Sequence, residues 1–163
     1  MYFAAALAKS EQGWTGVELD LDEVDDLESL ADLLRDLTGE GEGPALLLLE
    51  EDDEHLAVVR VDGGAGSLAE PRVFLSDRRA VGNSEVAAML WEDADGEGAD
   101  DDDEGTRPIA EPVGDSALLA DLGTSAQSLL DLCAEEGLLP ADVLTTVCER
   151  AGCDDVLERL REG

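Results

Sequence analysis

The sequence predicts an α+β fold: a small, mainly antiparallel sheet with two helices, followed by an acidic linker and a small C-terminal helical bundle. Short apolar runs separated by turn residues fill much of the first half, which is typical of strands in a sheet. The last part of the chain shows only helical periodicity. Hydrophobic residues make up 44% of the chain but aromatic residues only 3%, so Leu, Val and Ala must build the core.

The predicted strands differ in how apolar they are. Residues 45–49 are continuously apolar, which predicts a strand buried on both faces. The next strand alternates more clearly, because Arg60 stands between Val59 and Val61. The acidic stretch between these two strands is a plausible hairpin connection. The predicted strands cover residues 2–8, 14–19, 45–49, 56–61 and 72–75.

Two helices accompany this sheet in the prediction. The first opens at Asp22, carries Leu residues at three- and four-residue spacing, and ends at the glycines before Pro44. The second is capped by Ser76 or Asp77 and reaches about Trp91.

Short helices are also predicted along the C-terminal part. Asp115 caps a short turn through Leu122, and Thr124 with Gln127 forms a capping box for the next helix. Later helices begin at Pro140 and at Asp154 or its successor. Each is short, so its stability must come from packing against neighbours.

Residues 92–106 interrupt these patterns. Nine of the first thirteen residues in this stretch are acidic, and none is a large hydrophobe. Such a segment cannot bury enough apolar surface to offset the entropy of ordering, so we expect a disordered linker. The sequence therefore predicts an α+β domain at 1–91, a linker at 92–106 and a helical region at 107–163.

The charge of the chain restricts its partners. It has 42 acidic and 10 basic residues and a formal net charge of -32. This field repels phosphate backbones and anionic membranes, so neither direct nucleic-acid binding nor membrane binding is expected. A basic protein is the favoured partner, although the charge could serve solubility alone. No run of 18 apolar residues or secretory signal is evident, and three cysteines give no disulfide framework, which predicts a cytoplasmic protein.

No catalytic, cofactor-binding or metal-binding residue is predicted, and the protein is expected not to be an enzyme. The single histidine, His55, stands at a strand start among carboxylates, where a surface position is the default. Cys133 and Cys148 fall on apolar helix faces and are expected in the core, and their spacing from Cys153 contains no zinc motif.

Two near matches to known motifs are also set aside. Residues 93–104 nearly fit a calcium-binding loop, but Glu97 replaces the expected Asp or Asn and no helix is expected to follow. Residues 121–123 read Asp-Leu-Gly, as in acyl carriers, but Ser125, Ala126 and Gln127 stand where that motif has Asp-Ser-Leu, so the acceptor serine is missing.

Several segments together resemble one family. They are the opening YFAAALA with Trp14, the block LLLLEEDDEHLAVVRV at 46–61, VFLSD at 73–77 and LLADLG at 118–123. The chain resembles the actinobacterial tRNA adenosine deaminase-associated proteins, which implies a functional link to a tRNA-editing deaminase. The chain itself lacks the H-x-E and P-C-x-x-C motifs of zinc nucleobase deaminases, so it is not predicted to be that enzyme.

The resemblance and the charge give the first hypothesis: a non-catalytic acidic partner or regulator of a tRNA adenosine deaminase or of another basic protein. The residues expected to carry binding are the acidic rim at Glu50–Glu54 and Asp100–Glu104. The alternative is a small-molecule-binding domain or an uncharacterised enzyme that uses the acidic face around His55. A structural role in a larger assembly stays open, and the sequence predicts no oligomeric state.

The linker prediction can be tested by neutralising Asp100–Asp103 to Asn. If the run steers a basic partner, association should slow and its dependence on salt should flatten. The thermal unfolding midpoint should stay unchanged, because no buried contact is lost. A clearly shifted midpoint would place the segment in the packed structure, and an unchanged association rate at low salt would leave the run as a solubility spacer.

Overall fold

The fold is described by a computed structural model. It describes residues 2–10, 13–24, 26–38, 44–51, 55–62, 71–77, 85, 88–89, 112–135 and 137–162. The predicted linker at 92–106, the calcium-loop match at 93–104 and most of the helix expected up to Trp91 lie outside these residues.

A six-stranded antiparallel sheet forms the centre of the structure, in the order β2-β1-β3-β4-β5-β6. The α+β prediction is confirmed, and the five predicted strands are all present. The sixth is a two-residue strand that the sequence pattern does not announce. The strands are β1 (Tyr2–Ser10), β2 (Gly13–Glu18), β3 (Ala45–Glu51), β4 (His55–Val61), β5 (Arg72–Leu75) and β6 (Val113–Gly114).

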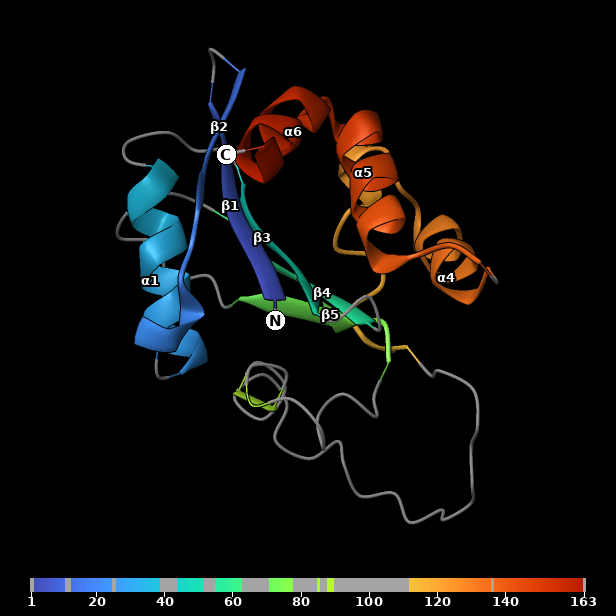
Figure 1. The fold of residues 1–163 in the computed structure, drawn as a ribbon, viewed down its shortest axis with the longest axis horizontal. Coiled ribbons are helices and arrows are strands. Elements are labelled where there is room, and N and C mark those ends of the chain that lie inside the picture. The colour runs from blue at the N-terminus through green and yellow to red at the C-terminus, as the bar shows by residue number, and fades with distance from the viewer. Residues whose placement is uncertain are drawn as a thin grey trace.

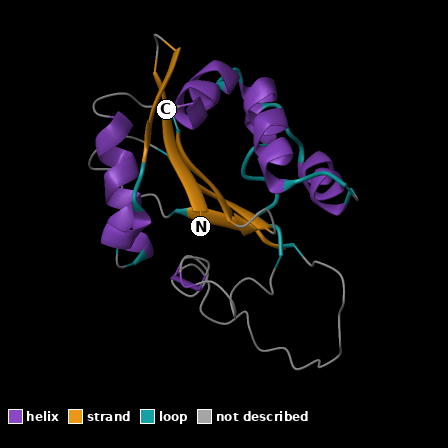
Figure 2. Ribbon diagram, viewed as in Figure 1, coloured by secondary structure: helices purple, strands orange, loops and turns teal. Residues whose placement is uncertain are grey.

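Helices cover both faces of this sheet (Figure 1). Helix α1 (Leu27–Thr38) lies on one face. Helices α4 (Ala126–Ala134), α5 (Pro140–Ala151) and α6 (Asp154–Glu162) lie on the other. Figure 2 shows the sheet as the middle layer of three. None of the described helices is both long enough and apolar enough to cross a bilayer.

Side-chain alternation divides the sheet residues between two apolar clusters. Leu47 and Leu49 of β3 face α1, whereas Leu46 and Leu48 face α5 and its neighbours. The prediction that this strand is buried on both faces is therefore confirmed. The alternating pattern of the next strand, β4, does not correspond to an exposed face. Every residue of β4 is buried, including Arg60.

The first helix starts later than the sequence suggests. Asp22 does not open it; residues Leu21–Glu23 form a separate 3-10 turn, η1, whose cap is the side chain of Asp20. The α-helix itself begins at Leu27. The carboxylate of the preceding residue, Asp26, accepts a hydrogen bond from the Ser29 N–H at 2.8 Å. The correction arises because two Asx-type turns compete with continuous helix in this Asp-rich stretch.

The C-terminal helices follow the sequence prediction with one change of cap. Pro140 is the first residue of α5, Asp154 begins α6, and Asp115 caps the turn that leads to η2 (Ala120–Leu122). Ser125, not Thr124, caps α4 through its hydroxyl, which accepts from the N–H of Ser128. Thr124 is instead fully buried.

Helix α6 closes against strand β2, which joins the helical region to the sheet. The Trp14 indole N–H donates to the Ala151 carbonyl at 3.2 Å, at the end of α5. Gly16, the next residue of β2 on the same face as Trp14, lies under Val156 of α6. A Cβ at position 16 would come within 2.8 Å of Val156 Cγ1 and would also meet Leu7. The absence of a side chain at position 16 therefore lets the helix approach the strand.

Replacing Gly16 by Ala should destabilise the protein, because the added methyl group overpacks the joint between α6 and β2. A cost of about 1–3 kcal/mol in the free energy of unfolding is expected. Equilibrium urea unfolding would measure it, with Thr15→Ala at the neighbouring exposed position as control. A Gly16→Ala protein as stable as the control would show that α6 does not approach the strand this closely.

Candidate interaction surface

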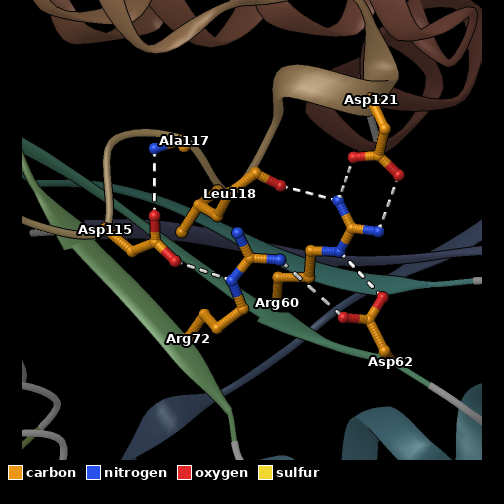
Figure 3. A network of polar contacts seen from close by, with 7 residues as sticks. All are labelled: Arg60, Asp62, Arg72, Asp115, Ala117, Leu118 and Asp121. Carbon is orange, nitrogen blue, oxygen red and sulfur yellow. Dashed lines mark hydrogen bonds and ion pairs between the residues drawn. The ribbon is translucent and has the colours of Figure 1, made fainter.

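The most extensive polar network joins β4 and β5 to the segment that leads into the C-terminal helices (Figure 3). The guanidinium of Arg60 forms two hydrogen bonds with Asp121, at 2.6 and 3.0 Å, and donates to the Leu118 carbonyl at 2.6 Å. Its Nε donates to Asp62 at 2.9 Å. Arg60 is buried, so these bonds supply the partners that a charge inside a protein requires.

A second arginine fixes the start of the same segment. Arg72 Nε lies 2.7 Å from Asp115 Oδ2, and the other oxygen of Asp115 accepts from the N–H of Ala117 at 3.0 Å. The bond from Arg72 lowers the pKa of Asp115, and the bonds from Arg60 lower the pKa of Asp121. Both carboxylates are therefore held ionised and engaged, and the network fixes the chain instead of offering a free site.

The acyl-carrier-like residues receive structural roles in this arrangement. Asp121 pairs with Arg60, and Leu122 belongs to the apolar cluster under the helices. Gly123 adopts a left-handed backbone with φ of 105° and ends η2, while Ser125 caps α4. These residues connect η2 to α4.

His55 is buried, so the expectation of a surface position is wrong. Its side chain is 8% exposed, and Nε2 lies 3.3 Å from Glu51 Oε1 of the adjacent strand. The cause is its place in β4, which has a strand on each side and a helical layer over each face. A sequence rich in neighbouring carboxylates gave no signal of this burial.

The acidic rim expected at Glu50–Glu54 also requires correction. Glu50 is buried and forms an ion pair with Arg161 of α6 at 2.8 Å, so it holds the C-terminal helix to the sheet. The Arg161 guanidinium lies 5.0 Å from the centroid of the Phe3 ring, a cation–π contact. Residues 52–54 and the second expected stretch, Asp100–Glu104, lie outside the described residues.

The cysteines behave as core side chains. Cys148 is fully buried, as expected, and Cys133 is half-buried against the same apolar cluster. Burial raises the pKa of Cys133 to about 11, so this thiol is neutral at physiological pH. The bond to Cys153, with burial, also raises the pKa of Cys148. Within the described ranges, no group of three or more potential ligands is placed to hold a metal ion.

Exposed carboxylates gather instead on the surface that runs from the end of β2 through α1. We call this the acidic α1 surface. The only basic residue in this stretch, Arg35, is paired with Asp32 at 3.0 Å. The acids on α1 itself point outward because Leu30 and Leu34 occupy its buried face. The surface comprises Asp20, Asp22, Glu23, Asp26, Glu28, Asp32 and Asp36, all exposed.

Two large apolar side chains are exposed close in sequence to these acids. Val17 of β2 is 43% exposed and Leu33 of α1 is 44% exposed. Leu139, before α5, is the third exposed large hydrophobe among the residues that the structure describes. Single exposed apolar residues are ordinary, but apolar contacts beside charge are also what a protein partner uses.

The Arg60–Asp121 pair predicts a pH-dependent stability. Since the folded state lowers the pKa of Asp121, its stabilisation is fully present above the unfolded value, near pH 4, and is lost as the pH falls through the lowered value. Asp121→Asn should therefore unfold at lower urea concentration than wild type at pH 7. The difference should disappear in acid. The control Glu158→Gln, which removes an exposed charge on α6, should unfold at nearly the same urea concentration as wild type at every pH. If the two variants unfold alike, Asp121 does not stabilise the fold through Arg60.

Comparison with known proteins agrees with the resemblance that the sequence motifs carry. Residues 2–154 match the family described as Rv3753c-like tRNA adenosine deaminase-associated protein. The match includes all six strands and the helices up to the start of α6. Neither the curated proteins nor the solved structures gave a match. The chain belongs to the Rv3753c-like tRNA adenosine deaminase-associated protein family.

Proposed function

We propose that this protein is a non-catalytic, cytoplasmic partner of a tRNA adenosine deaminase, which it binds directly and regulates. Membership of the deaminase-associated family is the observation that carries the proposal. An enzyme that grips tRNA needs basic surface, and a protein with a net charge of -32 is attracted to such a surface.

The acidic α1 surface supports this role because its carboxylates are exposed. Glu28, Asp32 and Asp36 recur at four-residue spacing, which aligns them along one side of α1. On this side Asp32 is paired with Arg35, while Arg60, Arg72 and Arg161 are engaged elsewhere with Asp121, Asp115 and Glu50. A basic protein surface can therefore meet several carboxylates at once, in competition with RNA.

The alternative function, chemistry around His55, has less support from the geometry. The histidine is buried beside Glu51, and Glu50 is committed to Arg161. The hydroxyl of Ser76, the residue that lies beside β4 at this end, accepts from the backbone N–H of Leu56. Packing of the sheet accounts for these contacts.

Neutralising part of the acidic α1 surface tests the proposal. Glu28→Gln with Asp36→Asn should slow association with the cognate tRNA adenosine deaminase several-fold and flatten its salt dependence, because charge steers encounter. Stopped-flow or surface-binding kinetics at low and physiological ionic strength would measure both effects.

A matched control removes the same two charges from the opposite side of the sheet. Glu149→Gln with Glu158→Gln changes exposed residues of α5 and α6. This variant should associate nearly as fast as wild type if the acidic α1 surface is the binding side. Equal slowing of both variants would indicate attraction by net charge alone, and no association of the wild type at low ionic strength would reject direct binding.

A further inference from the structure

Strand β2 is an edge of the sheet. In the described part of the chain it has a strand neighbour, β1, on one side only. Its pairing with β1 runs without a bulge from Gly13 to Glu18. Natural edge strands are usually protected by Pro, Lys, bulges or a short length. The sequence GWTGVE contains neither Pro nor Lys and spans six residues.

The register shows which backbone groups of β2 face outward. The Leu19 N–H donates to the Ala4 carbonyl at 2.9 Å, just beyond the last paired residues. Alternate pairs of an antiparallel ladder are hydrogen-bonded, so Val17 with Ala6 and Thr15 with Ala8 are the bonded pairs. The N–H and C=O groups of Trp14, Gly16 and Glu18 therefore point away from β1, toward the open edge.

The side chains along this edge favour one kind of occupant. Val17, 43% exposed, faces the α1 side, whereas Glu18 lies on the opposite face of the strand and is also exposed. Exposed Asp20, Asp22 and Glu23 follow directly. An added strand that alternates apolar and basic residues would place an apolar side chain beside Val17 and a cation beside Glu18. A second copy of this chain would instead bring another acidic strand end.

We propose that β2 is the docking edge for an extended, basic segment of the protein partner, which adds a strand to the sheet beside Trp14, Gly16 and Glu18. Main-chain hydrogen bonds give affinity in this mode of recognition, and the alternate side chains give specificity. This inference rests on the proposed function, since it names the surface that the deaminase would use, and it extends the acidic α1 surface to the sheet edge beside it.

Amide hydrogen exchange of the full-length protein with the cognate tRNA adenosine deaminase tests the proposal residue by residue. Binding should slow exchange at the N–H groups of Trp14, Gly16 and Glu18, while those of Thr15 and Val17, already bonded to β1, should change little. Binding without this alternating protection would overturn the docking edge and leave the proposed function standing.

A pair of variants separates the backbone from the charge. Glu18→Pro removes one outward N–H without touching the ladder to β1, and Glu18→Gln removes the same charge but keeps the N–H. Glu18→Pro should bind the deaminase about ten-fold more weakly than Glu18→Gln, because a carbonyl of the incoming strand loses its partner. Equal affinities in two folded variants would contradict the proposal, and if Glu18→Pro fails to fold, the exchange pattern of the wild type decides.

A synthetic peptide of alternating Lys and Val separates the two proposals if the deaminase does not bind at low ionic strength. The same peptide with alternate N-methylated residues, which cannot form the strand hydrogen bonds, is its control. Alternating protection by the first peptide and not by the second would support the docking edge for another basic partner. No protection by either probe would overturn it, and dimerisation of the chain through β2 would assign the edge to a second copy.

Discussion

The two central strands bury both of their faces, and the rest of the structure depends on this constraint. Every residue of β4 and nearly every residue of β3 is withdrawn from water. With few aromatic residues, the chain covers this sheet with Leu, Val and Ala from two layers of helices. Because α1 alone covers only one face, the C-terminal helices are needed to complete the fold, and the three layers are one packed unit in the described part of the chain.

A buried arginine determines how the second helical layer is attached. Arg60 stands on the face of β4 that meets the C-terminal segment, among apolar neighbours, and the cost of withdrawing its charge is offset by Asp121, Asp62 and the Leu118 carbonyl. These bonds fix η2 on the sheet before α4 begins. Arg161 attaches the other end of this layer in a similar way, through an ion pair with Glu50 and a cation–π contact with Phe3.

The same pairs shape the surface. Basic side chains are scarce, and Arg60, Arg72 and Arg161 are used to join elements of the fold. Their acidic partners are neutralised there, and Asp32 is paired with Arg35, whereas Glu28 and Asp36 on α1 are exposed to solvent. The scarcity of cations thus links the stability of the interior to the acidic exterior that we propose as the contact with a basic enzyme.

Much of the fold could be predicted from local sequence patterns. The continuous apolar run at 45–49 specified a strand with two buried faces, and Pro140 marked the start of α5, because its fixed backbone suits the first position of a helix. The family resemblance was likewise carried by local segments. In the stretch before α1, the local pattern predicted the wrong helix start, since Asp20 and Asp26 cap two separate turns.

What the sequence by itself determined was therefore the five longer strands, the helices of the C-terminal region, the acidic charge and the family resemblance. Only the tertiary structure decided that the helical region shares a core with the sheet, that His55 and Glu50 are interior residues, and that one group of exposed acids lies on α1 and just before it. The physical reason is that burial and ion pairing depend on neighbours distant in the chain: Arg161 meets Glu50, and Arg60 meets Asp121, through packing that no local spacing records.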